Sequence, residues 1–223
     1  MDQNIVIVSG GRLGDLDFFR KETSQAVRCM LIACDSGARH LAAAKMTPDV
    51  VIGDMDSVHH EQLADFEGQG VKIIRHPAGK DLTDTALALD YALGLKPKKI
   101  DIWGAQGGRL DHTLANLFLL IRGKQAGVKT RLMDEYCEAF VSGSQTTIMD
   151  ASGCLVSLVA LSWRVEGVSL KGFQYPLNNE TLSISESRGV SNMIMADRAA
   201  ILVRSGDLLV IRYWQKDVFP EVV

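Results

Sequence analysis

The chain has 223 residues, of which 47% are hydrophobic and 23% are charged, and this is the composition of a globular protein with a substantial core. Its 24 basic and 27 acidic residues give a net charge of −3, which argues against non-specific binding to nucleic acid or to an anionic membrane surface. No apolar run approaches the roughly 20 residues of a membrane span. The first residues lead into a predicted strand without a basic segment, so we expect no signal peptide. The four cysteines form no C-x-x-C pair, and we expect reduced thiols in a cytoplasmic protein.

Short apolar runs alternate with helical patterns in the first part of the chain. This alternation predicts a doubly wound, mostly parallel sheet. We expect strands at 4–9, 30–33, 50–52, 71–75, 100–103 and 129–133, and helices at 15–27, 36–44 and 59–69, behind residue 82, and around Leu114, Leu117, Phe118 and Ile121.

The pattern changes after about residue 142, where strand-like segments are separated by Gly, Asn, Pro and Ser. We expect strands at 146–149, 155–161, 168–175, 181–185, 199–204 and 208–213, with a hairpin turn at Ser205-Gly206-Asp207. The predicted fold class is therefore an α/β domain over residues 1–142, followed by a small all-β sandwich or barrel over residues 143–223.

A pair of carboxylates follows the predicted strand at 50–52, in Gly53-Asp54-Met55-Asp56-Ser57. If the backbone stays extended, Asp54 and Asp56 project to the same side, and their like charges repel each other unless a cation neutralises them. Carboxylate oxygens suit Mg²⁺, which also binds water and phosphate oxygens. The alternative is a solvated turn, in which Asp and Ser are ordinary residues.

Further acidic residues fall at strand ends or at the start of the next helix, and in a doubly wound sheet these positions meet on one rim. Each of these residues alone is explained as a helix cap or a turn residue, and Ser36 is likewise explained as an N-cap. Together with Lys80 and Arg109 they indicate a bound cation. The loop that begins at Gly104 is glycine-rich and lets a phosphate approach the backbone, although it matches neither common phosphate-binding motif. The acidic set is Asp35, Asp54, Asp56, Asp81, Asp84 and Asp111.

Four motifs in this order resemble the thiamine pyrophosphokinase family: C-D-S-G-A (34–38), G-D-M-D-S (53–57), K-D-L-T-D (80–84) and G-G-R-L-D-H-T-L-A-N (107–116). The resemblance continues through Y-P-L-N-N-E-T-L (175–182) and G-V-S-N (189–192), so it covers nearly the whole chain. It implies an enzyme that transfers the pyrophosphoryl group of ATP to the hydroxyl of thiamine, giving thiamine diphosphate and AMP. It also implies homodimers, in which the catalytic half of one subunit and the β half of the other enclose thiamine.

The resemblance implies a role for each matching residue. Some members stack thiamine on a tryptophan, and Tyr175 stands at the corresponding place here. The implied catalytic residues are Asp54, Asp56, Asp84, Arg109 and Asp111, and the implied Mg²⁺ ligands are Asp54, Asp56 and Asp84. The implied ATP-binding residues are Asp35, Lys80, Asp81, Thr83 and Arg109, and the implied thiamine-binding residues are Asp111, Tyr175, Ser191 and Asn192.

Two other functions are weighed against this one. The first is a magnesium-dependent transferase that acts on a different alcohol, which would keep the phosphate machinery but need an unrelated β half. The second is a nucleotide-sensing module without catalysis, which would show gaps in the acidic set. The complete acidic set and the matching β half favour the thiamine enzyme over both.

Overall fold

The computed structural model describes residues 3–24, 29–56, 60–77, 79 and 81–214. The chain forms two compact units, Met1–Glu135 and Tyr136–Val223. The sequence predicts a division between residues 142 and 143, whereas the units divide before β7 (Cys137–Val141). They divide there because β7 pairs with β14 (Leu208–Tyr213) of the second unit.

The first unit is built on a parallel sheet with the strand order β6-β5-β1-β2-β3-β4. Apolar residues predominate in the central strands, and in β1 both faces are buried, with Ile5, Ile7 and Val8 fully enclosed. Burial on both faces is the reason why the strands read as continuous apolar runs. The strands are β1 (Asn4–Val8), β2 (Cys29–Cys34), β3 (Val50–Gly53), β4 (Lys72–Arg75), β5 (Lys99–Trp103) and β6 (Lys129–Met133).

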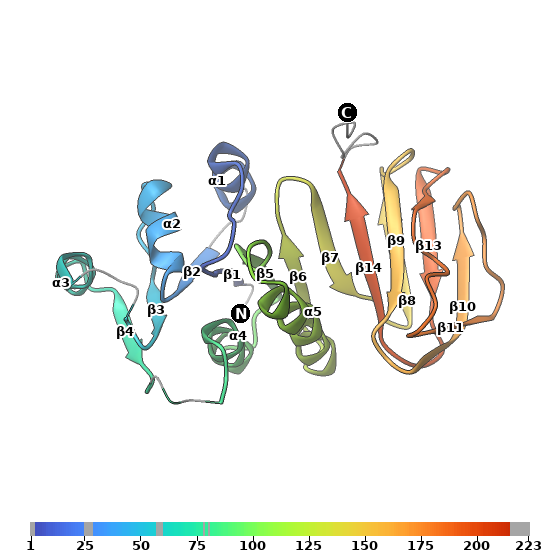
Figure 1. Ribbon diagram of the computed structural model, residues 1–223. Helices are drawn as coiled ribbons and strands as arrows, with labels where there is room; N and C mark the ends of the chain where they lie inside the picture. Colours follow the sequence, from blue (N-terminus) through green and yellow to red (C-terminus); the bar gives the residue numbers. More distant parts are fainter. Residues whose placement is uncertain (1–2, 25–28, 57–59, 78, 80, 215–223) are drawn as a thin grey trace. The chain divides into compact units, whose positions relative to one another are not determined.

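Helices cover both faces of this sheet, which confirms the predicted doubly wound class. Figure 1 shows α1 and α2 on one side of the sheet and α4 and α5 on the other. Trp103 of β5 packs against α1, with ring centroids 5.2 Å from Phe19 and 6.0 Å from Phe18. The helices are α1 (Leu16–Ser24), α2 (Gly37–Ala43), α3 (His60–Gly68), α4 (Asp84–Gly94) and α5 (Leu110–Gln125).

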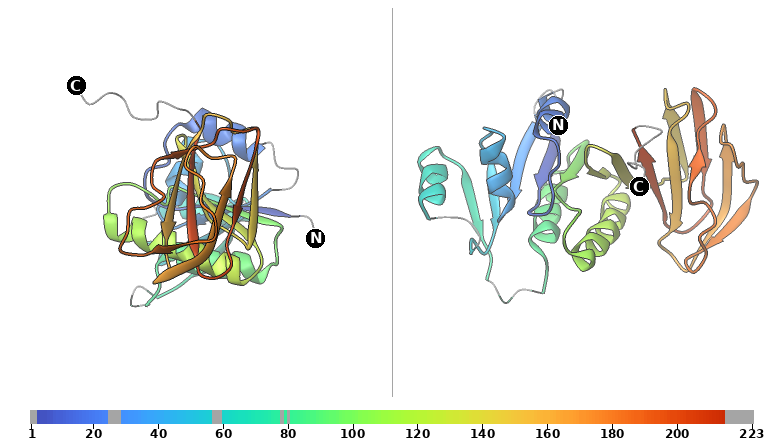
Figure 2. Two further views of the ribbon diagram at one scale, coloured as in Figure 1. Left: turned by 90° about the vertical axis from the view of Figure 1, so that its right-hand side faces the viewer. Right: turned by 45° about the horizontal axis from the view of Figure 1, so that its top comes forward.

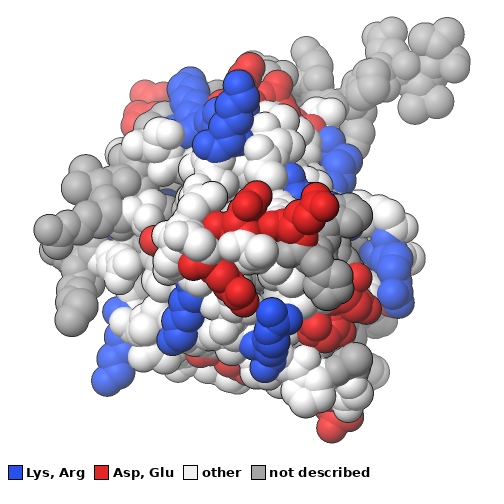
Figure 3. Space-filling model, turned by 90° about the vertical axis from the view of Figure 1, so that its left-hand side faces the viewer, with Lys and Arg blue, Asp and Glu red and all other residues white. Residues whose placement is uncertain are grey.

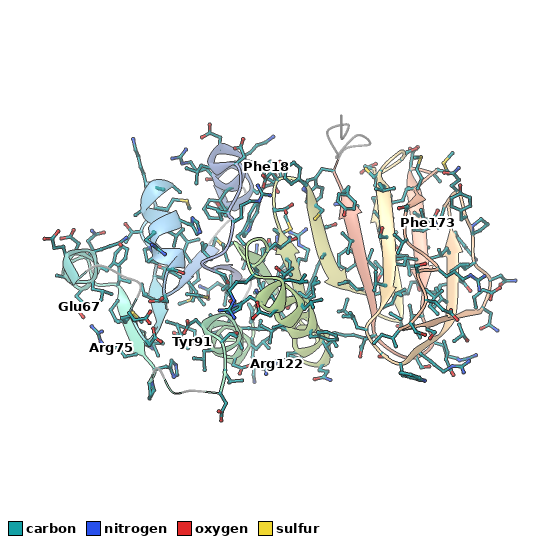
Figure 4. All side chains as sticks on the ribbon, viewed as in Figure 1. Phe18, Glu67, Arg75, Tyr91, Arg122 and Phe173 are labelled. Atoms are coloured by element: carbon teal, nitrogen blue, oxygen red, sulfur yellow. The ribbon has the colours of Figure 1, made fainter. Side chains whose placement is uncertain are left out.

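Side-chain contacts tie α4 to its neighbours, and Figure 4 labels two of the residues involved, Tyr91 and Arg122. Arg122 of α5 pairs with Asp90 of α4 at 2.9 Å, and the Lys72 ammonium of β4 lies 5.2 Å from the centroid of the Tyr91 ring. These groups are exposed, so they add little stability. The first turn of α4 carries Asp84.

The apolar residues that predict α5 do not form its buried face. Leu114 and Phe118 are 48% and 47% exposed, and Leu110 is 73% exposed. The helix instead packs through a face that includes a polar amide. This buried face consists of Asn116, Leu119, Leu120 and Gly123.

At the end of the first unit formed by α3 and β4, acidic side chains gather near the middle of the face and basic side chains lie mostly around them (Figure 3). Glu67 of α3 and Arg75 of β4 pair there at 3.5 Å. Among the described residues on this face there is therefore no basic patch of the kind that binds a nucleic acid backbone.

The second unit is a sandwich of two antiparallel sheets (Figure 2), with strand orders β12-β9-β14-β7 and β11-β10-β13-β8. Val156, Leu158 and Val210 of the first sheet and Val168 and Ile201 of the second belong to one buried core. The remaining strands are β8 (Gln145–Met149), β9 (Leu155–Ala160), β10 (Arg164–Lys171), β11 (Glu180–Ser183), β12 (Asn192–Met193) and β13 (Arg198–Leu202).

The predicted hairpin at Ser205-Gly206-Asp207 is wrong. The strands on either side of it belong to different sheets, because β13 pairs with β10 and β8 while β14 pairs with β7 and β9. Gly206 has φ of 91°, and a Cβ there would lie 2.6 Å from the carbonyl oxygen of Arg164. Glycine at this position therefore allows the chain to pass close to β10 as it crosses from one sheet to the other. Hairpin turns also favour glycine, so the two structures share this sequence pattern.

Within the described ranges, no helix combines the length and the apolarity needed to cross a bilayer.

Candidate active site

A cavity of about 560 Å³ lies at the carboxyl ends of β1 and β5. The strand order reverses between these two neighbouring strands, because β2, β3 and β4 lie on one side of β1 and β5 and β6 lie on the other. Ligands of open α/β sheets bind at such a point. The cavity is lined by Ser9, Gly10, Gly11, Arg12, Cys34, Ser36, Thr83, Asp84, Thr85, Gly104, Ala105, Gly107, Gly108, Arg109, His112 and Asn116.

Two glycine-rich loops, one after β1 and one after β5, form the walls of this cavity. Backbone hydrogen bonds join them, from Gly11 to Gly104 at 2.7 Å and from Arg12 to Gln106 at 2.9 Å. A Cβ on Gly11 would lie 2.6 Å from two carbonyl oxygens, so only glycine allows this contact. The buried amide of Asn116 donates to the carbonyl of Ala105 at 2.8 Å and ties the second loop to α5.

Asp35, Asp54 and Asp56 form an acidic cluster beside this cavity, in which one carboxylate oxygen from each lies within 4.8 Å of the others. Asp35 is 6% exposed, and its Oδ1 is buried without a hydrogen-bond partner among the described residues. A buried, unsatisfied carboxylate oxygen is costly unless a cation or a donor compensates it. The cluster therefore fits a hard divalent cation such as Mg²⁺.

The backbone brings Asp54 and Asp56 together through a turn, and not through the extended conformation considered from the sequence. Met55 has φ of 66° and is 7% exposed. The N–H of Asp56 donates to Oδ1 of Asp54 at 3.3 Å. The buried Met55 side chain anchors the turn, and the two carboxylates lie at its surface.

Asp84 connects the acidic cluster to the cavity. Its Oδ1 lies 3.3 Å from the position that a Cβ on Gly53 would occupy, and Cβ of Asp35 lies 2.8 Å from the same point. Asp84 also lines the cavity. Its position is set by Thr83, which caps α4 by accepting a hydrogen bond from the N–H of Ala86 at 3.2 Å.

Arg109 and Asp111 form an ion pair at the start of α5. Nε of Arg109 donates to Oδ1 of Asp111 at 3.1 Å, and a second guanidinium nitrogen donates to Oδ2. This bonding lowers the pKa of Asp111 to about 2 and raises that of Arg109. Both groups therefore carry full charge near neutral pH. They are exposed, so an anion can draw Arg109 away at little cost.

The other predicted residues of the first unit have less defined surroundings. Asp81 is exposed in the loop before α4, and Lys80 lies outside the described residues. Ser36 occupies the N-cap position of α2 but makes no capping hydrogen bond, since its backbone is already helical, with φ −59° and ψ −16°. Cys34 lines the cavity, and burial raises its pKa to about 12, so its thiol is neutral and unsuited to nucleophilic attack.

Three predicted thiamine-binding residues lie close together in the second unit. Tyr175 is 60% exposed, and Ser191 is exposed with φ of 59°. Asn192 is only 3% exposed, and both polar atoms of its side chain bond to the backbone of Tyr175.

Several residues that line the cavity were not predicted from the sequence, among them Ser9, Arg12, Thr85 and Asn116. The signal was partly present, because Gly10-Gly11 follows a strand and Asn116 ends one of the family-like motifs. Their contacts were not visible in the sequence. Ser9 and Thr85 share a hydrogen bond at 2.8 Å although they are 76 residues apart.

Comparison with protein-family models finds two matches. Residues 24–132 match "Thiamin pyrophosphokinase, catalytic domain", and residues 145–209 match "Thiamin pyrophosphokinase, vitamin B1 binding domain".

Individual relatives agree with these matches over nearly the whole chain. Thiamine pyrophosphokinase of Bacillus subtilis (strain 168) is 32% identical over 215 residues, which are 94% of this chain and 98% of that protein. The solved structure of the Bacillus subtilis enzyme superposes with a TM-score of 0.83 at 30% identity, covering 94% of this chain and 98% of the other. The solved structure of the Geobacillus thermodenitrificans enzyme superposes with a TM-score of 0.80 at 28% identity, covering 97% of this chain and 100% of the other. The chain is a member of the thiamine pyrophosphokinase family of enzymes, as the sequence motifs predict.

Proposed function

We propose that this enzyme transfers the pyrophosphoryl group of ATP to the hydroxyl of thiamine, giving thiamine diphosphate and AMP. The observation that carries the proposal is the acidic cluster of Asp35, Asp54 and Asp56 beside a cavity walled by two glycine-rich loops. Such a transfer depends on positioning the phosphates and neutralising their charge. The cluster and the loops provide groups for both tasks.

We assign Mg²⁺ to the acidic cluster. Asp54 and Asp56 would hold the ion, together with Asp35 through its unsatisfied oxygen, and Asp84 stands next to them. When bound, Mg²⁺ neutralises charge on the phosphate oxygens and aligns them for transfer. Asp35 extends the predicted set of ligands, which contained Asp54, Asp56 and Asp84.

We assign ATP to the cavity. Backbone N–H groups of glycine-rich loops hold phosphates closely, because no side chain keeps the anion away. Arg109 lies at the edge of the cavity and can leave Asp111 to pair with a phosphate. The assignment of Lys80, Asp81 and Thr83 to ATP rests on the family resemblance.

We assign thiamine to Asp111, Tyr175, Ser191 and Asn192, again on the resemblance. An ionised Asp111 attracts the positive charge of the thiazolium ring, and a carboxylate of ordinary pKa stays ionised throughout the physiological range even after Arg109 has left it. In the reaction the hydroxyl oxygen of thiamine forms a bond to the β-phosphorus and loses its proton. The bond from the β-phosphorus to the α,β-bridging oxygen breaks, and that oxygen leaves with AMP.

We further propose a homodimer whose thiamine sites combine the catalytic unit of one subunit with the β unit of the other. Exposed Leu110, Leu114 and Phe118 continue along α5 from the Arg109–Asp111 pair, and an apolar helix face next to a site favours coverage by protein. We expect the enzyme to act in the cytoplasm, and the free thiols of Cys29, Cys34 and Cys154 support a reducing compartment.

A coupled assay of AMP release from ATP tests the proposed function. We expect release to require both thiamine and Mg²⁺. AMP release with another alcohol but not with thiamine would support a different acceptor. Nucleotide binding with no AMP release under any condition would support the sensing module.

A further inference from the structure

Two segments of the second unit that are distant in sequence form a short antiparallel ladder. The N–H of Gln174 donates to the carbonyl of Met193, and that of Met195 to the carbonyl of Gly172, both at 2.8 Å. Phe173, labelled in Figure 4, and Ile194 form the bridge between these bonds, and they are 6% and 0% exposed. The two side chains anchor the ladder in the core of the sandwich.

The side-chain amide of Asn192 closes this ladder at Tyr175. Its Oδ1 accepts from the N–H of Tyr175 at 3.0 Å and from the N–H of Met193 at 2.8 Å. Its Nδ2 donates to the carbonyl of Tyr175 at 2.8 Å. Both acceptor positions of Oδ1 and one of the two N–H groups of Nδ2 are thus used, and the residue is only 3% exposed, which leaves little of it open to a ligand.

Tyr175 itself has its backbone fixed and its ring exposed. Asn192 holds its N–H and its carbonyl, and Pro176 restricts it to an extended conformation. The residue is 60% exposed. A backbone held in place before binding reduces the conformational entropy that is lost when a ligand stacks on the ring.

We infer that Asn192 is a positioning residue, which acts on thiamine through Tyr175 and not by direct contact. The inference rests on the proposed function, because it takes the aromatic face of Tyr175 as the surface for the cationic substrate. Ser191 differs from its neighbour, because its side chain is exposed and its backbone N–H is held by Ser157 at 3.1 Å. We therefore assign direct contact with thiamine to Ser191.

A double-mutant cycle tests the inference. Asn192→Asp keeps the shape and the Oδ1 acceptor, but it places a carboxylate oxygen against the Tyr175 carbonyl. We expect the KM for thiamine to rise about tenfold with the KM for ATP unchanged, as for a lost buried hydrogen bond. In a Tyr175→Ala background the same change should alter the KM for thiamine less than about twofold, because the aromatic ring through which Asn192 acts is absent.

Asn178→Asp is the matched control, since it makes the same change on an exposed residue of the same unit and should leave both constants unaltered. Asn192→Ser serves as a second variant without an added charge, and thermal melting identifies any variant that fails to fold. A tenfold effect of Asn192 in both backgrounds would overturn the inference and indicate direct contact. Wild-type AMP release that does not depend on thiamine would instead refute the proposed function, and the inference with it.

Discussion

The backbone N–H of Asp56 donates to Oδ1 of Asp54 at 3.3 Å across Met55, whose φ of 66° is unusual for a residue with a side chain. Such strain persists where the surroundings fix it, and it is concentrated at functional sites. Here the buried Met55 side chain holds the turn. The pair of carboxylates is thereby arranged before any ligand arrives.

We expect Asp54→Asn and Asp56→Asn to fold normally but to lower turnover about a hundredfold or more, since each removes charge from the proposed Mg²⁺ site. Circular dichroism and thermal melting should match the wild type while AMP production collapses. Asp65→Asn, on the exposed side of α3, is the control and should be fully active. Native turnover in either variant would remove that residue from the metal site.

Gly53→Ala should disturb the acidic cluster without removing any carboxylate. The added Cβ would lie 2.8 Å from Cβ of Asp35 and 3.3 Å from Oδ1 of Asp84, so at least one carboxylate has to move. We expect a loss of stability of about 1–3 kcal/mol and a higher Mg²⁺ concentration for half-maximal activity. Gly68→Ala, where nothing lies within 4 Å, is the control. An unchanged Mg²⁺ dependence in Gly53→Ala would show that the spacing is not critical.

Arg109→Ala should lower turnover about a hundredfold and raise the KM for ATP more than that for thiamine, because the guanidinium is proposed to neutralise phosphate charge. Arg109→Lys should recover little, since an ammonium cannot bind two oxygens in the same geometry. Steady-state kinetics with each substrate varied measures both effects, with the exposed Arg204→Ala as a control. Full activity in Arg109→Lys would reduce the residue to general surface charge.

Much of the fold was predictable because burial on both faces leaves a continuous apolar run in the central parallel strands β1, β2 and β3. The strand at Cys137–Val141 was not predicted, since its partner β14 lies far along the chain. The acidic residues were found individually from their positions at strand ends. Their exact grouping was not, because it depends on the left-handed turn at Met55 and on the absence of a side chain at Gly53.

Subunit mixing tests the proposed shared site. One chain carries Asp56→Asn, and the other carries both Tyr175→Ala and Ser191→Ala; each homodimer should be inactive. After exchange about half the dimers are heterodimers with one intact site, so about a quarter of wild-type activity should return. Size-exclusion chromatography with differently tagged chains verifies the exchange. No recovery despite exchange would place the whole site within one subunit and leave the acidic cluster unaffected.

The most direct test of the central claim is ³¹P NMR of the products that the purified enzyme forms from ATP and thiamine. We predict AMP and thiamine diphosphate in equal amounts, formed only with Mg²⁺ and nearly absent with Asp56→Asn. ADP with thiamine monophosphate would contradict pyrophosphoryl transfer, and AMP with free pyrophosphate would contradict thiamine as the acceptor.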